Sequence, residues 1–289
     1  MEKFYVDDCP KELPVADWIK SKIKWREATN DVIASSPSAK YMDMVFEFTG
    51  DLDGLKKSVS DALSTYGFFG WRTSVGDEKN YGGYSITYNP NLQYDDQDIH
   101  QHTLGTKLNA PSDFYAGSSV NHTYLKNSYL DGMSFTEFTP AAKIGYMGKL
   151  LEDINSRITI TRSRLGIVKG SEVSDENRYH IDSEVFELCR LNIPIIANEC
   201  FAFQFQGRLP YVLEEGRAYT WQTELPHRVY CHKKTSLDRA NMVIGLSPWL
   251  SYDKQERYWY ANEFYGKKHP FDMIIDGDVT DKIKFLGAR

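Results

Sequence analysis

The second half of the chain consists almost entirely of short strand-like runs, and this feature limits the possible folds more than any other. The runs are rich in β-branched and aromatic residues and are separated by Gly, Asn and Asp turns. They cover residues 157–168, 185–197, 200–206, 217–222, 227–231 and 241–246. No helical periodicity separates them, which disfavours a doubly wound α/β fold. The sequence predicts a mainly β protein with flanking helices and a jelly-roll or barrel core.

Three amphipathic segments in the first half predict the flanking helices. The first spans about residues 10–28. The second spans residues 51–66, with acidic residues at its start and Gly67 after its end. The third begins at Thr139, which we expect to act as the N-cap before Pro140 at the first helical position.

The amino-acid composition and the hydrophobic pattern divide the chain into three regions. We expect residues 1–156 to form a helical and loop-rich region that packs on a β core of residues 157–250. Residues 251–289, with many aromatic side chains, predict a wrapping extension. Residues 68–138 are rich in Gly, Tyr, Asn and Ser, which is typical of strands joined by long binding loops or lids. Together the three regions are expected to form one integrated domain.

Charge and cysteine usage exclude several classes of function. The net charge is −6 and no block of basic residues is present, so nucleic-acid binding is not expected. No run of about 18 apolar residues predicts a membrane span, and the polar N-terminus does not resemble a secretory signal. The four cysteines form no C-x-x-C pair, which favours free thiols in a reducing compartment. These features predict a soluble, cytoplasmic protein whose oligomeric state stays open.

A constellation of two histidines, one aspartate and one arginine indicates a metal site. His180 and Asp182 form the only His-x-Asp or His-x-Glu of the chain, His227 follows Asp182 by 45 residues, and Arg239 comes 12 residues later. In a strand, residues i and i+2 point to the same face, so His180 and Asp182 can ligate one ion, joined by His227 from a neighbouring strand. Two imidazoles and one carboxylate are typical of non-haem Fe(II) sites that activate O2. The alternative is a turn histidine, an Asp182–Arg178 ion pair and a core histidine.

Arg239 opens an apolar strand, where a charged side chain needs a partner. A guanidinium matches a carboxylate with two parallel hydrogen bonds and stays charged when buried. We therefore expect Arg239 to anchor the distal carboxylate of an acidic cosubstrate. A salt bridge to Asp238 or to another acid is the alternative.

The stretch from His180 to Leu250 resembles the aspartyl/asparaginyl β-hydroxylase branch of the Fe(II)/2-oxoglutarate-dependent oxygenases. The resemblance is carried by His180-Ile-Asp182, Arg190-Leu-Asn-Ile-Pro-Ile195, Pro226-His-Arg-Val229, Asp238-Arg239 and Trp249. It covers about residues 157–250 and implies a double-stranded β-helix core of the cupin-like kind. It also implies Fe(II) as the metal, 2-oxoglutarate as cosubstrate and O2 as oxidant. Because Asp182 is present, the chain is similar to the three-ligand members, which include hydroxylases of free amino acids.

The same resemblance implies that Arg190 helps to bind the oxo acid, with a structural salt bridge as the alternative. Where the family often has a second histidine, this chain has Asn192, which donates a hydrogen bond but carries no charge. The implied activity is hydroxylation of an unactivated C–H bond, most readily in an amino-acid side chain that is free or within a peptide or protein. Succinate and CO2 would be released. The rival hypotheses are a cupin-like metalloenzyme without 2-oxoglutarate chemistry and a non-catalytic β-sandwich binding module.

Weaker signals concern the substrate. Arg162 and Arg164 are two residues apart in the first core strand, so both are expected on one face of it. They could bind a substrate carboxylate, or they could form ion pairs. Trp221 could line a pocket together with Trp71 and Tyr81, or these aromatics could be core residues. The run 95–102 mixes acids with His100 and His102 and predicts a solvated loop or a substrate-facing lid. His232 is expected at the surface.

Overall fold

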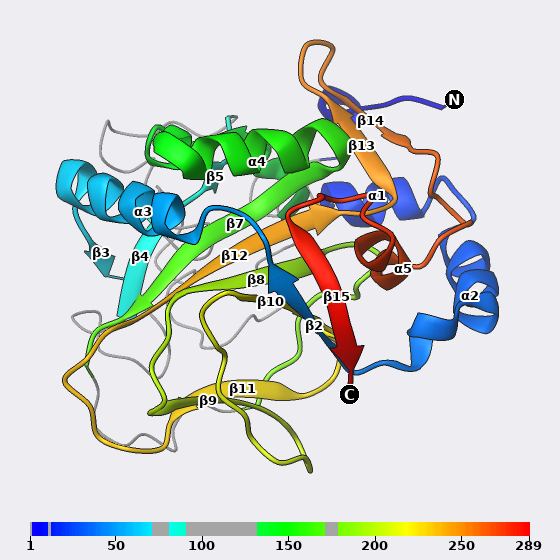
Figure 1. Ribbon diagram of the computed structural model, residues 1–289. Helices are drawn as coiled ribbons and strands as arrows, with labels where there is room; N and C mark the ends of the chain where they lie inside the picture. Colours follow the sequence, from blue (N-terminus) through cyan, green and yellow to red (C-terminus); the bar gives the residue numbers. More distant parts are fainter. Residues whose placement is uncertain (1, 11–12, 71–80, 91–131, 171–178) are drawn as a thin grey trace.

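An eight-stranded antiparallel sheet dominates the computed structural model, which describes residues 2–10, 13–70, 81–90, 132–170 and 179–289 (Figure 1). From one edge to the other the strand order is β15-β2-β10-β8-β12-β7-β4-β3. The bounds, in that order, are Ile283–Ala288, Asp43–Phe48, Arg217–Trp221, Cys189–Ile196, Arg239–Ser247, Thr159–Val168, Tyr81–Ser85 and Phe69–Gly70.

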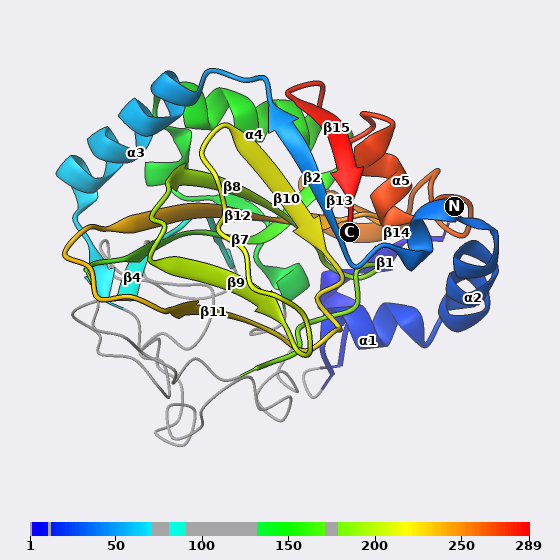
Figure 2. The ribbon, with the colours of Figure 1, turned by 60° about the horizontal axis from the view of Figure 1, so that its bottom comes forward.

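A smaller sheet faces the large one on the side opposite the long helices (Figure 2). It contains β9 (Phe201–Phe205) and β11 (His227–Cys231), and it is extended by the isolated bridges His180–His227 and Phe203–Tyr211. From β7 to β12 the chain alternates between the large sheet and the small sheet. The exception is β9, which is followed by the bridge residue Tyr211 in the same small sheet. This winding is that of a double-stranded β-helix, so the predicted jelly-roll core is confirmed.

Two long helices cover the outer face of the large sheet (Figure 1). They are α3 (Leu52–Tyr66) and α4 (Gly145–Arg157), and their apolar residues join those of β7, β8 and β12 in one buried cluster. On the inner face, Phe203, Phe205, Tyr219 and Trp221 form a separate cluster between the two sheets. The large sheet therefore has two different buried faces.

The third predicted helix begins later than its sequence suggests. Thr139 accepts a hydrogen bond from the Ala142 N–H at 3.3 Å, but the element that follows is a 3-10 turn, Ala141–Lys143, and its N-cap is Pro140. The α-helix starts only at Gly145, because Ser58 of α3 supplies its cap: the Ser58 Oγ accepts from the Tyr146 and Met147 N–H groups at 2.9 and 3.2 Å. A side chain at Gly145 would collide with that oxygen, since a Cβ there would lie 2.6 Å from it.

The remaining elements close the ends of the molecule. The predicted helix 10–28 is wrong in extent, because it is broken after residue 20 into α1 (Val15–Lys20) and α2 (Trp25–Ser35). A three-stranded sheet combines β1 (Phe4–Tyr5), β14 (Tyr258–Ala261) and β13 (Leu250–Asp253), and β5 (Thr87–Tyr88) pairs with β6 (Glu137–Phe138). The C-terminal segment contributes α5 (Pro270–Ile275) and β15. Further 3-10 turns span Val6–Asp8, Pro37–Lys40 and Gly132–Ser134.

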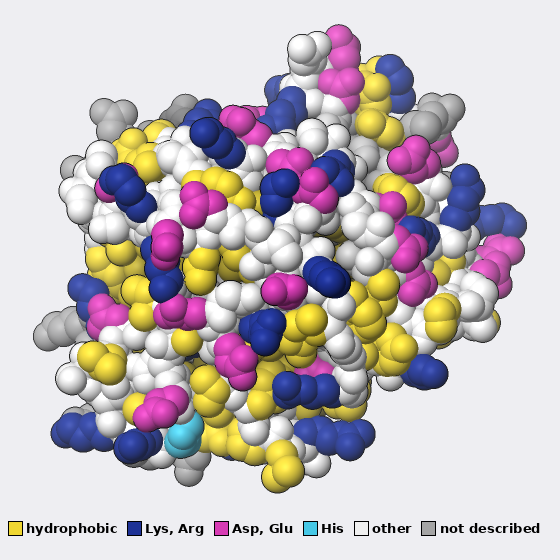
Figure 3. Space-filling view, in the orientation of Figure 1, with side chains coloured by type: hydrophobic (Ala, Val, Ile, Leu, Met, Phe, Trp, Pro, Cys, Tyr) yellow, Lys and Arg dark blue, Asp and Glu magenta, His cyan; other side chains and the backbone are white. Residues whose placement is uncertain are grey.

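The surface charges, the cysteines and the helix lengths can be compared with the sequence analysis. On the face shown in Figure 3, basic and acidic side chains are interspersed rather than separated by sign. Cys9, Cys189, Cys200 and Cys231 are buried thiols. Among the described parts of the chain, no helix combines the length and the apolar character that a membrane crossing needs.

Candidate metal centre

His180 and His227 are held side by side by their own backbones. The N–H of each residue donates to the carbonyl of the other at 3.0 Å, and the two imidazole rings lie 4.5 Å apart between centroids. His227 is the first residue of β11, and His180 adds a single bridge at the edge of the same sheet. Two histidines that are 47 positions apart in sequence thus become neighbours at one end of the small sheet.

Asp182 joins the two imidazoles from the same extended segment as His180. Its N–H donates to the Thr223 carbonyl at 2.8 Å, and the Thr223 hydroxyl donates to the Ser183 carbonyl at 2.7 Å. The Asp182 Oδ2 lies 3.9 Å from the His180 Nε2 and 3.6 Å from the His227 Nε2. The three ligand atoms are all within 4.8 Å of one another, so one ion can reach all of them.

The hydrogen bonds and charges around His227 and Asp182 suit the binding of a divalent cation. The His227 Nδ1 lies 2.8 Å from the Leu225 carbonyl, and an Nδ1–H donated to that oxygen leaves Nε2 free to ligate. Burial alone would raise the pKa of Asp182, but Arg190 and the imidazoles outweigh it and hold this pKa well below its ordinary value. Two imidazole nitrogens and one carboxylate oxygen therefore lie together, which is the donor set of a non-haem Fe(II) site.

Arg190 pairs directly with Asp182. It is the second residue of β8, and one guanidinium nitrogen donates to the Asp182 Oδ2. Both side chains are buried, at 8% exposure each. The guanidinium thus contacts the same oxygen that faces the two imidazoles, and it fixes the orientation of the carboxylate.

The inner face of the large sheet carries a row of polar side chains beyond this pair. Asn192, two residues after Arg190, accepts a hydrogen bond from the Asn241 side-chain amide at 3.0 Å. Asn241 lies on β12, next to β8, and was not expected from the sequence. The signal that could have found it is the alternation of Arg239 and Asn241 at the start of an otherwise apolar strand.

Several buried polar atoms on this inner face have no hydrogen-bond partner among the described residues. They are the Thr161 Oγ1, the Arg162 Nε and Nη2, the Trp221 Nε1 and the Asn241 Oδ1. Buried polar groups are normally satisfied, and each exception calls for an explanation. A polar ligand between the two sheets supplies one.

The other predicted site residues spread along the same interior. Trp221 lies on β10 with its ring 6.5 Å from the His227 ring, and it also packs on Phe203. Arg164 of β7 is in register with Val243 of β12, which is in register with Asn192. Arg239 begins β12 opposite Val168 and lies on the same face of the strand as Asn241. Gly245, near the other end of β12, lies opposite Arg190 of β8. The backbones of Arg239 and Gly245 are therefore about 20 Å apart along the strand.

Some expectations cannot be placed. Trp71, the run 95–102 and Arg178 lie outside the described residues, and so do most of the predicted loops in 68–138. The side chain of Tyr81 lies outside them as well. His232 is exposed and follows the end of β11, as expected for a residue that is not a ligand.

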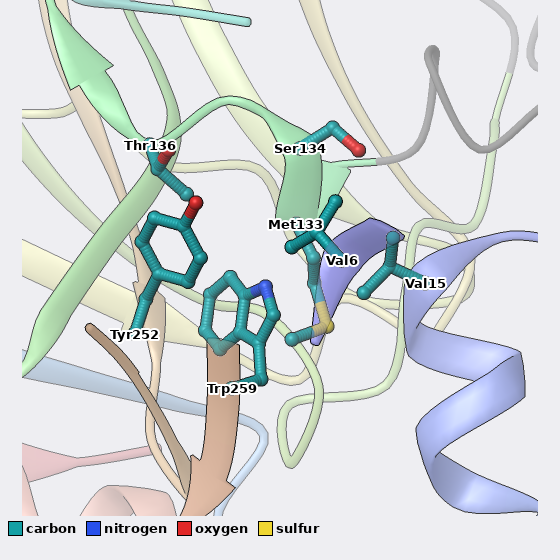
Figure 4. Close-up of a pocket in the computed structure, with 7 residues that line it drawn as sticks. All are labelled: Val6, Val15, Met133, Ser134, Thr136, Tyr252 and Trp259. Atoms are coloured by element: carbon teal, nitrogen blue, oxygen red, sulfur yellow. The ribbon is translucent and has the colours of Figure 1, made fainter. Parts of the chain in front are cut away.

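A small cavity elsewhere in the molecule does not involve the metal ligands. It lies where the N-terminal segment meets β13 and β14 and is partly open to solvent (Figure 4). Its lining residues are Val6, Val15, Met133, Ser134, Thr136, Tyr252 and Trp259. Its volume is about 10 Å³, which is room for about one water molecule, so the cavity is no rival to the centre.

The backbone is similar to solved structures of known enzymes. A prolyl hydroxylase from Trichoplax adhaerens, in complex with a peptide of hypoxia inducible factor, shares 12% identity, with 83% of this chain and 94% of that one covered at a TM-score of 0.37. The α-ketoglutarate-dependent epimerase SnoN of nogalamycin biosynthesis shares 9%, with 76% and 83% covered at 0.41. HygX from Streptomyces hygroscopicus, with nickel, 2-oxoglutarate and hygromycin B bound, shares 9%, with 72% and 84% covered at 0.36.

No protein-family model and no curated protein sequence matches this chain. At such low identity the structural likeness concerns the course of the backbone. The function has to follow from the residues of this protein.

Proposed function

We propose that this protein is an Fe(II)- and 2-oxoglutarate-dependent dioxygenase of the aspartyl/asparaginyl β-hydroxylase-like branch. We infer that it hydroxylates an unactivated C–H bond of an amino-acid side chain. The observation that carries the proposal is the meeting of His180, Asp182 and His227 at one end of a double-stranded β-helix. The unpartnered polar atoms on the inner face of the barrel support a second, polar ligand beside the metal.

The residues present fit the metal. His180, Asp182 and His227 would hold Fe(II) and leave room at the metal for the cosubstrate and O2. When bound, the iron would supply the oxidation in which one oxygen atom of O2 enters the C–H bond and the other converts 2-oxoglutarate into succinate and CO2. The chain supplies orientation: Arg190 holds the Asp182 carboxylate, and the Leu225 carbonyl holds the His227 ring.

The cosubstrate assignment follows from charge. 2-Oxoglutarate is a dianion, and a guanidinium that faces the barrel interior would bind its distal carboxylate. Arg239 takes this role in the proposal, while Arg190 and Asn192 contribute nearer to the metal. Asn241 extends this set, because its amide already bonds Asn192 and its oxygen is unpartnered among the described residues.

Formation of succinate tests the proposal directly. The purified protein is supplied with Fe(II), 2-oxoglutarate, ascorbate and each free amino acid in turn, and succinate and O2 uptake are measured together. We expect the two to be coupled one to one and to be stimulated by at least one amino acid. If none stimulates turnover, peptides are screened next.

A matched pair of histidine variants separates the proposal from its rivals. His180→Ala removes a ligand whose side chain is 43% exposed, so little packing is lost, while His232→Ala removes an exposed histidine outside the site. Only the first is expected to abolish turnover. Metal binding without O2 uptake in the wild type would instead indicate a cupin-like hydrolase or isomerase. A protein that binds neither metal nor 2-oxoglutarate would be a binding module.

A further inference from the structure

Arg162 is a buried cation to which the proposed reaction assigns no role. Its side chain is 4% exposed, and its Nε and Nη2 have no hydrogen-bond partner among the described residues. A buried guanidinium is normally paired, because removing its charge from water costs free energy that only a partner offsets. Two of its nitrogens are thus ready to donate to a ligand.

The backbone holds Arg162 in an unusual conformation that turns it out of the regular strand. A β-bulge interrupts β7, since Val243 and Gly245 of β12 are in register with Arg164 and Thr161. Within the bulge Arg162 has a φ of 40°, in the left-handed region that favours glycine. Such conformations persist where the surroundings impose them and cluster at binding sites.

The neighbouring chain makes room for this side chain. The Arg162 N–H donates to the Phe135 carbonyl at 3.3 Å, which fixes the bulge against the turn Gly132–Ser134. A Cβ at Gly132 would lie 2.9 Å from the Arg162 Cδ. Any larger residue at position 132 would therefore push the arginine aside.

Within the part of the chain that the structure describes, the charges around Arg162 leave an excess of cations. Arg162 interacts electrostatically with Arg190, Asp182 and Arg164. The Asp182 carboxylate already pairs with Arg190. Glu187 is also in range, but it pairs with Lys20. Burial, with Arg190 second, lowers the pKa of Arg162 to about 10, so the guanidinium is still charged at neutral pH.

Binding of the metal and the cosubstrate does not remove this excess. A divalent ion adds two positive charges and the oxo acid brings two negative ones. Among the described residues, the Arg162 and Arg190 guanidiniums then still face the single carboxylate of Asp182. The Arg162 Nε and Nη2 therefore await an acceptor, and a carboxylate group of the remaining component of the reaction, the substrate, would supply it.

We propose that Arg162 binds the α-carboxylate of the substrate, so that the substrate is a small free amino acid and not a residue inside a polypeptide. A residue within a polypeptide has an amide at the position of the α-carboxylate and offers no charge there. The inference rests on the proposed function, because the substrate is defined as the molecule that reaches the metal centre.

Equilibrium binding tests the inference without relying on turnover. The Fe(II)- and 2-oxoglutarate-loaded protein, kept anaerobic, is titrated with the free L-amino acids and with their α-carboxamides. We expect at least one amino acid to bind at least tenfold more tightly than its carboxamide. Arg162→Gln should weaken the binding of that amino acid at least tenfold. It should leave the Kd of the carboxamide and the Kd of 2-oxoglutarate unchanged.

Two further variants serve as controls. Arg162→Lys keeps the charge but not the two-pronged donor, and should recover part of the affinity. Arg257→Gln is the matched control, because Arg257 is the other described non-glycine residue with a left-handed φ, at 58°, and its side chain is 47% exposed and pairs with Asp7. It should change neither affinity.

Thermal unfolding of the unliganded protein separates binding from a structural role. Removal of a buried charge without a partner should leave the Tm of Arg162→Gln equal to or above that of the wild type. A Tm several degrees lower would overturn the inference, and so would a carboxamide that binds as well as its acid. Weaker 2-oxoglutarate binding in Arg162→Gln would assign the residue to the cosubstrate instead. Carboxylate binding that depends on Arg162 without any succinate formation would overturn the proposed function alone.

Discussion

The two faces of the large sheet differ in what they bury. The outer face presents Leu191 and Ile193 of β8 to α3 and α4, within one continuous apolar cluster. The inner face presents Arg190 and Asn192 of the same strand, together with polar atoms that have no partner among the described residues. A strand alternates its side chains, so consecutive residues of β8 serve opposite purposes.

This difference shows where stability and chemistry reside. The outer face gains free energy from apolar burial and needs no ligand. The inner face holds charges at a cost to the free protein, and that cost is recovered when metal and anions bind. Changes on the two faces should therefore separate cleanly in experiments.

The largest effect is expected from Asp182→Ala on the inner face. It removes a metal ligand, and we expect turnover to fall by at least about 10³-fold, which corresponds to about 4 kcal/mol. It also leaves Arg190 buried without its carboxylate, and breaking a buried pair in this way costs about 3–5 kcal/mol of stability. Metal titration and urea unfolding measure the two losses. A variant that still binds Fe(II) with the affinity of the wild type would remove Asp182 from the ligand set.

The corresponding change on the outer face is Leu151→Ala in α4. Leu151 is fully buried against the large sheet, and such truncations cost about 2–5 kcal/mol. We expect the urea midpoint to fall while the Fe(II) and 2-oxoglutarate affinities of the folded protein stay unchanged. Weakened metal binding at low urea would show that the two faces are coupled, against the separation argued above.

The buried histidine His269 predicts how the stability of the protein changes at acidic pH. Burial lowers the pKa of His269 to about 4, although Asp272 opposes the shift, and its Nδ1 accepts from the Phe271 N–H at 3.1 Å. The unfolded chain binds this proton near pH 6.5, so stability is fully present above that pH and is lost as the pH falls toward 4. The loss reaches up to about 3 kcal/mol. Unfolding of the wild type and of His269→Gln between pH 7 and 4.5 checks it, and equal slopes would contradict it.

Arg239→Gln probes the far end of the inner face. If Arg239 anchors the distal carboxylate, the KM for 2-oxoglutarate should rise about 10- to 100-fold, or about 1.4–2.8 kcal/mol. Because the residue is only partly buried at the start of β12, stability should change little. An unchanged KM would transfer the anchoring role to another residue of the inner face, such as Arg190.

The sequence predicts the core well because its signals are local. Each predicted run from 157 to 246 contains a strand, since alternation within one segment reveals a buried face. Strands β2 and β15, at one end of the large sheet, were missed because they pair with one another although they lie far apart in sequence. The helix 10–28 was drawn as one because periodicity does not show the break between α1 and α2.

The site divides in the same way. His180, Asp182 and His227 follow from a motif and a spacing, and the structure brings them together. The Asn192–Asn241 hydrogen bond depends on the register between β8 and β12, which no single segment encodes. The orientation of Arg162 depends on a bulge that the bare alternation of Arg162 and Arg164 does not reveal.

The smallest expected effect tests whether the packing of the outer face can be weakened without changing the activity of the metal centre. Asp51 caps α3, and its Oδ1 accepts from the Gly54 N–H at 2.8 Å. Asp51→Ala should cost about 1 kcal/mol of stability, because one N–H at the helix start loses its partner. Asp51→Asn keeps the acceptor and should restore most of it. Since the apolar stripe of α3 packs on the outer face of the sheet, succinate formation at 25 °C should stay at the wild-type level in both variants, and a drop in Asp51→Ala alone would show that the position of α3 affects the inner face.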